Sequence, residues 1–163
     1  MPFIGIVTNL KNEQYMKKML SMDFPIENII FITNKNIENI KNIRFETVVI
    51  DSKIEDLKNL KLIVSNAKYI ILNADLNIDL KLLEDLNLVI ITYGFNNKAT
   101  FSVSSVSEIN IIICLQRIIN NIFEEKYEPQ EFEINADQNI DIHAILCTKI
   151  ILIIYKKMNT LST

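Results

Sequence analysis

Short apolar runs alternate with segments of helical spacing through the first 94 residues, and this pattern most constrains the fold. Each run ends in polar residues, and the runs lie at Phe3–Thr8, Ile29–Thr33, Arg44–Asp51, Lys68–Asp75 and Leu88–Thr92. Runs that are apolar at consecutive positions are typical of strands buried on both faces of a parallel sheet. The pattern therefore predicts an α/β fold with a mainly parallel, Rossmann-like or P-loop-NTPase-like sheet flanked by helices.

The segments between the runs carry apolar residues at helical spacing. We expect helices at Lys11–Met22, Ile37–Ile43, Ser52–Asn66 and Ile78–Leu86. Asp51 or Ser52 is expected to cap the third of these helices, because short polar side chains bind the free N–H groups at a helix start.

The pattern changes after Gly94, where polar and apolar residues alternate in Ala99–Val106 and a second strand follows almost at once. Alternation without an intervening helix predicts a C-terminal extension of antiparallel strands. We expect Ile118–Phe123 and Gln130–Ile134 to continue it, and Ile140–Met158 to form a final long helix. The length of the chain suits a single domain over residues 1–163.

The charge balance argues against two classes of partner. A net charge of −3 and a pI near 5.2 are the opposite of the basic footprint of proteins that bind nucleic acid or anionic membranes. The N-terminus has no pattern of a signal peptide, and Ala144–Tyr155 is too short for a bilayer and contains Lys149. With Cys114 and Cys147 interpreted as buried free thiols, we expect a cytoplasmic protein.

Polar residues at the carboxyl ends of the predicted strands are the candidates for a binding site, because ligands of open α/β sheets bind there. The tentative ligand-binding residues are Thr8, Asn9, Asn73, Asp75, Thr92 and Tyr93. The alternative is that these side chains cap helices and complete turns. We identify no catalytic residue and no metal site, since His143 is the only histidine and the acidic residues Glu124–Glu133 match no calcium loop.

The scarcity of glycine excludes a standard phosphate loop. Gly5 and Gly94 are the only glycines, and Gly5 lies inside the first strand. Loops that wrap phosphates need several glycines so that backbone N–H groups can converge on the phosphate oxygens. No cofactor is therefore predicted, and the sequence gives no P-loop to support Mg-ATP.

Two segments carry a family resemblance. Asn73-Ala74-Asp75 ends one predicted strand, and Thr92-Tyr93-Gly94-Phe95, with Ala99 shortly after, ends the next. This stretch resembles the ATP-binding central domain of the Mur ligases, enzymes that add amino acids to cell-wall precursors. Loosely, the resemblance extends over the whole chain and implies the same α/β fold.

The chain departs from this family where ATP would be handled. The family's Gly-Thr-x-Gly-Lys-Thr loop would follow Ile6, where this chain has Val7–Asn12, and of the family's His-Asn-x-x-Asn-Ala-x-Ala-Ala helix start, only Ala144 is kept. The family's partner domains are also missing from this sequence. The resemblance therefore implies a pseudoenzyme that acts as a non-enzymatic interaction or regulatory module, through self-association or an unknown protein partner. The alternative is a protein that binds a small ligand or nucleotide at the carboxyl ends of the parallel strands.

Overall fold

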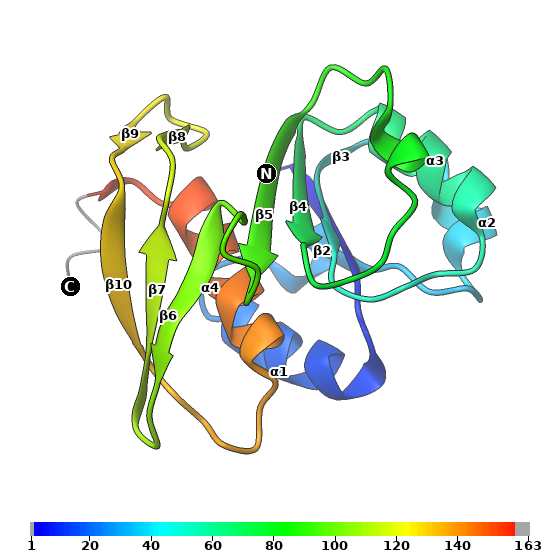
Figure 1. The fold of residues 1–163 in the computed structure, drawn as a ribbon. Helices are drawn as coiled ribbons and strands as arrows, with labels where there is room; N and C mark the ends of the chain where they lie inside the picture. The colour runs from blue at the N-terminus through cyan, green and yellow to red at the C-terminus, as the bar shows by residue number, and fades with distance from the viewer. Residues whose placement is uncertain (1, 159–163) are drawn as a thin grey trace.

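Eight strands form one twisted sheet in the computed structural model, which describes residues 2–158 (Figure 1). The strand order is β10-β7-β6-β5-β4-β3-β1-β2. The strands are β1 (Phe3–Val7), β2 (Ile29–Phe31), β3 (Phe45–Ile50), β4 (Tyr69–Asn73), β5 (Val89–Gly94), β6 (Phe101–Val106), β7 (Asn110–Leu115) and β10 (Gln130–Asn135). The first five pair in parallel, which confirms the predicted α/β class with a mainly parallel, Rossmann-like sheet.

Helices cover both faces of the parallel strands, because consecutive residues of these strands are apolar and their side chains point to opposite faces of the sheet. On one face α1 (Leu10–Leu20) and α4 (Ile142–Tyr155) pack over Ile6, Val49 and Ile71. On the other face lie α2 (Ile37–Ile40), α3 (Leu57–Ser65) and the short 3-10 helix η2 (Leu80–Leu83). A further 3-10 turn, η1 (Ile26–Asn28), precedes β2. The chain thus forms two cores, one on each side of the sheet.

The predicted helices are all somewhat shorter in the structure, and two of them, predicted from Ser52 and from Ile78, are much shorter. The helix predicted from Ser52 begins at Leu57, and its cap is Asp56, whose side chain accepts from the Asn59 backbone N–H at 3.1 Å. The expected cap, Asp51, instead points into a network of side chains at the strand ends. The helix predicted at Ile78–Leu86 is reduced to the single 3-10 turn η2. The tail at 159–163 lies outside the described residues.

The C-terminal strands follow the prediction with two corrections. The strands β6, β7 and β10 form the expected antiparallel extension, and their apolar faces pack on α4. β6, however, also pairs in parallel with the end of β5, over Tyr93–Phe101 and Gly94–Ser102. The segment predicted to extend the sheet from Ile118 gives β8 (Ile119–Asn120), which pairs with β9 (Lys126–Tyr127) in a separate two-stranded sheet.

Burial agrees with the expected character of the core. α4 is buried almost all round, with ten of its fourteen residues inaccessible. Cys147 on this helix is a buried free thiol, whereas Cys114 on β7 is free but only partly buried. Within residues 2–158, no helix is long and apolar enough to span a bilayer.

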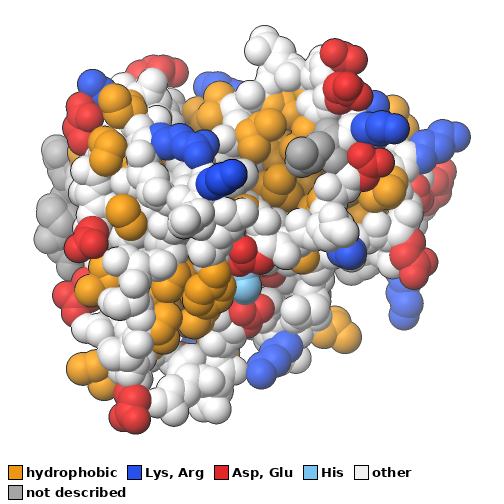
Figure 2. Space-filling model, in the orientation of Figure 1, with side chains coloured by type: hydrophobic (Ala, Val, Ile, Leu, Met, Phe, Trp, Pro, Cys, Tyr) orange, Lys and Arg blue, Asp and Glu red, His pale blue; other side chains and the backbone are white. Residues whose placement is uncertain are grey.

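One part of the parallel sheet is open to solvent. Because η2 is so short, no helix covers Ile90 on that face, and its side chain is 43% exposed. Val89, which points to the opposite face of the sheet, is 46% exposed. Figure 2 shows hydrophobic side chains gathered in a hollow over this region. The neighbouring residue Ile91 points to the α4 side and is only 1% exposed.

This contrast predicts different costs for two adjacent truncations. Ile91→Ala should lower the free energy of unfolding by about 2–5 kcal/mol, because it opens a cavity in the core. Ile90→Ala should lower it by about 1 kcal/mol or less, because the side chain is already half in water. Urea denaturation of both variants checks this expectation. Equal losses would mean that the open face is covered in solution.

Candidate functional site

The point where a ligand would be expected lies between β1 and β3. From β1 the chain runs to β2 on one side and then returns past β1 to β3, so the direction of winding reverses between these two strands. In doubly wound sheets the ligand crevice lies outside the carboxyl ends of the strands at this reversal. Here β1 ends at Val7 and α1 begins at Leu10, so only Thr8 and Asn9 connect them. Two residues are too few to form a loop around a phosphate.

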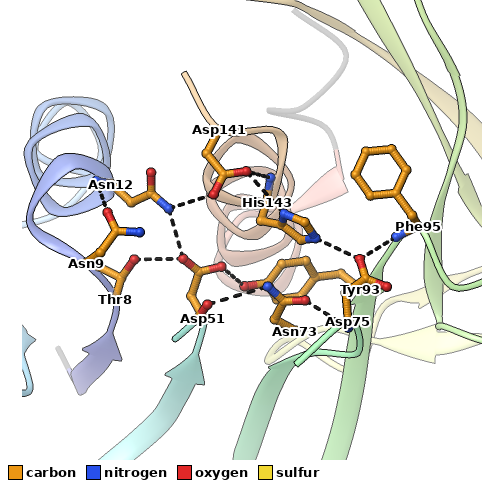
Figure 3. Close-up of polar contacts among 10 residues, drawn as sticks. All are labelled: Thr8, Asn9, Asn12, Asp51, Asn73, Asp75, Tyr93, Phe95, Asp141 and His143. Atoms are coloured by element: carbon orange, nitrogen blue, oxygen red, sulfur yellow. Dashed lines mark hydrogen bonds and ion pairs between the residues drawn. The ribbon is translucent and has the colours of Figure 1, made fainter. Parts of the chain in front are cut away.

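Asp51, the residue after β3, fills this crevice (Figure 3). Its side chain is 5% exposed and accepts hydrogen bonds from the Thr8 hydroxyl at 2.7 Å and the Asn12 amide at 3.2 Å. The Tyr93 hydroxyl donates a third hydrogen bond to the other carboxylate oxygen. Burial first, and then the charges of Cys147 and Asp51, raise the pKa of Tyr93 well above its ordinary value, so the phenol stays a neutral donor.

Asp75 ties the ends of β4 and β5 together. Its carboxylate accepts from the backbone N–H groups of Phe95 at 2.8 Å and Asn96 at 3.1 Å. Gly94, the last residue of β5, has φ +146°, and a Cβ at this position would lie 2.4 Å from an Asp75 carboxylate oxygen. The position therefore accepts only glycine without rearrangement. Asn73 completes the turn by accepting from the Asp75 N–H at 3.0 Å.

His143, in the first turn of α4, connects this helix to the Asp75 carboxylate at the ends of β4 and β5. Its Nε2 lies 2.7 Å from an Asp75 carboxylate oxygen, and its Nδ1 lies 3.1 Å from the carboxylate of Asp141. Asp141 is the N-cap of α4 and also accepts from the Asn12 amide at 3.0 Å. A protonated imidazole donates to both carboxylates at once. Figure 3 shows the resulting chain of contacts from Asp51 through Asn12 and Asp141 to His143 and Asp75.

The carboxylates change the protonation of this histidine. Burial lowers the pKa of His143, but the hydrogen bonds and charges of Asp75 and Asp141 outweigh it, and the net pKa lies above the ordinary 6.5. For Asp75 and Asp141, burial raises the pKa, and the hydrogen bonds they accept lower it below the ordinary 3.8. The charged forms of all three groups therefore stabilise one another.

The structure brings four of the six predicted binding residues into this network. These are Thr8, Asn73, Asp75 and Tyr93. Asn9 lies at its edge, where its side chain caps α1 by accepting from the Asn12 N–H at 2.9 Å. Thr92 is separate, because side chains alternate along a strand. It points to the opposite face, and its hydroxyl accepts from the Thr100 N–H at 2.9 Å.

Sequence reasoning left out Asn12, Asp51, Asp141 and His143 as binding residues, although they complete the network. Asp51 also ends a predicted strand, which was a signal for its position. His143 was considered from the sequence as a metal ligand and rejected as one, and no local pattern connects it to Asp75, 68 positions earlier. Their meeting depends on how α4 packs against the sheet.

The network carries more negative than positive charge. It contains three carboxylates, from Asp51, Asp75 and Asp141, against one imidazole. Such a site repels phosphates and other anions. Among residues 2–158, no group of three or more His, Cys, Asp and Glu side chains is arranged to hold a metal ion.

Comparisons with known proteins give no family. No model of a known protein family matches the sequence, and no curated protein does. Among solved structures, the apo-structure of D-lactate dehydrogenase from Escherichia coli matches with 21% sequence identity and a TM-score of 0.38. The match covers 55% of this chain and 30% of the dehydrogenase chain. The assignment to the α/β class rests on the order and pairing of the strands in the sheet.

The network predicts a pH-dependent contribution to stability. The histidine pKa is raised, so its contribution should be complete below pH 6.5 and lost as the pH rises through the raised value. The lowered aspartate pKa values mean that their contribution is lost as the pH falls below 3.8. Between pH 3.8 and pH 6.5 the free energy of unfolding of wild type should exceed that of His143→Gln by about 1 kcal/mol. The difference is small because the groups are partly exposed. Urea denaturation of both proteins from pH 3 to pH 9 measures this difference. A difference that does not change with pH would contradict the predicted role of the charged histidine.

Proposed function

We propose that this protein is a catalytically degenerate, Mur-ligase-like cytoplasmic domain that acts as a non-enzymatic interaction module. The observation that supports this most is the state of the strand-end crevice. The buried Asp51 carboxylate occupies it, and Thr8, Asn12 and Tyr93 bind that carboxylate rather than facing outward. A nucleotide would have to displace these hydrogen bonds and approach three carboxylates. The loss of the phosphate loop and the negative charge of the site thus both oppose nucleotide binding.

The open strip of β5 is the surface through which such a module would bind. Val89 and Ile90 belong to a parallel strand, whose side chains are normally covered on both faces. Two hollows border this strip: Lys68 and Arg117 line the one that contains Val89, and Asp79 and Glu84 line the one beside η2, with Ile90 common to both. Figure 2 shows basic and acidic side chains near an apolar hollow on this face of the molecule. In a twofold dimer the same surface of each copy faces the other copy. A surface with both charges on its border can therefore place its positive groups opposite the negative groups of the second copy.

A second candidate function is supported by a different crevice. Ile50, Ile54, Leu60 and Leu82 line a cavity of about 130 Å³ at the carboxyl ends of β3 and β4, on the α3 side. Ser52, Lys53, Asn77 and Asp79 add polar groups to its wall. Apolar walls with a few polar groups are typical of small-molecule sites. A small ligand bound here would support the alternative function, at residues other than the six predicted ones.

One titration distinguishes the two functions. With Mg-ATP up to millimolar concentration, we expect no heat, no thermal stabilisation and no amide chemical-shift changes at Thr8 and Asn12, because binding to the folded state alone would have to stabilise it. Micromolar binding that Thr8→Ala abolishes would contradict the closed crevice. Shift changes confined to Ser52 and Asn77 would instead support the small-ligand alternative.

Self-association through the open strip is tested by sedimentation velocity over a range of protein concentrations. Wild type should form dimers as concentration rises, and Val89→Lys should weaken the dimer about tenfold or more, since it puts a charge in the apolar contact. Leu62→Lys is a matched control, because Leu62 is also 46% exposed but lies on α3 away from the hollow. A monomer at all concentrations, or equal effects of the two variants, would contradict the proposed surface.

A further inference from the structure

A groove lies between α1, α4 and the edge strand β10. Tyr15 and Met19 from α1, Ile134 from β10, and Ile145 and Leu152 from α4 form its apolar walls. Its volume of about 340 Å³ falls within the range of small-molecule sites, about 300–1,000 Å³. The groove shares no lining residue with the Asp51 network or with the hollows beside β5, so a ligand could bind in it whether or not the proposed function is correct.

Two charged residues line this groove, Lys149 and Glu133, and Lys149 is the one cation among its described lining residues. The side chain comes from the middle of α4 and is partly buried, with Nζ 5.7 Å from the centre of the Phe132 ring. Burial, and secondarily the charge of Lys156, lowers the pKa of Lys149. In the part of the chain that the structure describes, no ion pair includes Lys149. A cation placed in apolar surroundings without a counter-ion is costly.

The neighbouring acidic residues are engaged elsewhere. Glu133 borders the groove, but its register opposite Ile112 places its side chain on the other face of the sheet, where the Asn110 amide donates to it. Asp137 accepts from the Asn139 backbone N–H at 3.0 Å. Lys156, the residue that follows α4, is paired with Asp23. Within residues 2–158, Lys149 therefore has no ion-pair partner, although the charge of Asp137 reaches Tyr15 on the opposite wall of the groove.

We propose that this groove binds a small amphipathic monocarboxylate, with its carboxylate on the Lys149 ammonium and its aliphatic or aromatic part against the apolar walls. A single lysine provides one point charge, which matches a monoanion better than a phosphate dianion. Tyr15 also lines the groove, and burial first, then the charge of Asp137, raises the pKa of this phenol, so in the proposed complex it is a neutral donor for the second carboxylate oxygen. Charge and apolar area act together, so neither alone is sufficient for binding.

Octanoate is a suitable probe, with 1-octanol and acetate as controls that lack the charge and the chain. Titration calorimetry of the purified protein should show octanoate binding at least about tenfold more tightly than either control. Lys149→Met should abolish this preference, Lys149→Arg should keep most of it, and Lys18→Met, an exposed lysine on α1, should leave it unchanged. Absence of octanoate binding, equal binding of octanol, or binding unaffected by Lys149→Met would overturn the proposal.

A second measurement needs no ligand and controls for folding. Because the Lys149 ammonium has no counter-ion in the structure, Lys149→Met should melt at the same temperature as wild type or higher. In wild type, NMR of the reductively methylated lysine should show its pKa rising when octanoate is added, since a nearby carboxylate favours the charged amine. A lower melting temperature for Lys149→Met would mean that the ammonium is already paired within the protein, which contradicts the proposed site.

Discussion

The buried carboxylate of Asp51 is the interaction on which the arrangement of this molecule depends. A carboxylate that is 5% exposed must have its oxygens hydrogen-bonded, because an unsatisfied buried charge would cost several kcal/mol. The donors come from three different elements: Thr8 after β1, Asn12 in α1 and Tyr93 in β5. Through Asn12 the same network reaches Asp141 and the start of α4. One charge thus holds the helices of one face in register with the carboxyl edge of the sheet, and in doing so it occupies the place where related folds bind ligands.

Local sequence signals were sufficient for the strands but not for the helices on the α3 side. The apolar runs of the parallel strands stand out because both of their faces are buried, and the described strands lie within or close to the predicted ranges. The helices predicted at Ser52 and Ile78 were too long because polar residues at their starts compete as turn formers. Asp56 captures the Asn59 N–H and fixes the later start of α3. The parallel pairing of β6 with β5 was missed because it covers two residue pairs only.

The candidate site was predictable in part, for a physical reason. Thr8, Asn73, Asp75 and Tyr93 follow from the rule that the carboxyl ends of parallel strands meet at one edge. Thr92 was misplaced because a single step along a strand reverses the side chain. Asp141 and His143 come from the last helix, and only tertiary packing decides which strand ends they reach. Asn73, Asp75, Gly94 and Phe95, from the two segments on which the family resemblance was proposed, form one unit around the Asp75 carboxylate, so these residues have a structural role here whatever their origin.

The position of α4 in the chain has a consequence for synthesis on the ribosome. This helix is the centre of one of the two cores, yet it follows every strand of the sheet in the sequence. Until residues 142–155 have left the exit tunnel, the apolar sides of β1, β4 and β5 on that face have only α1 to cover them. The other core, formed by α2, α3 and η2, needs no residue beyond Leu88. The nascent chain should therefore pass through a half-folded state in which one face of the sheet is complete and the other is exposed, the kind of species that chaperones recognise.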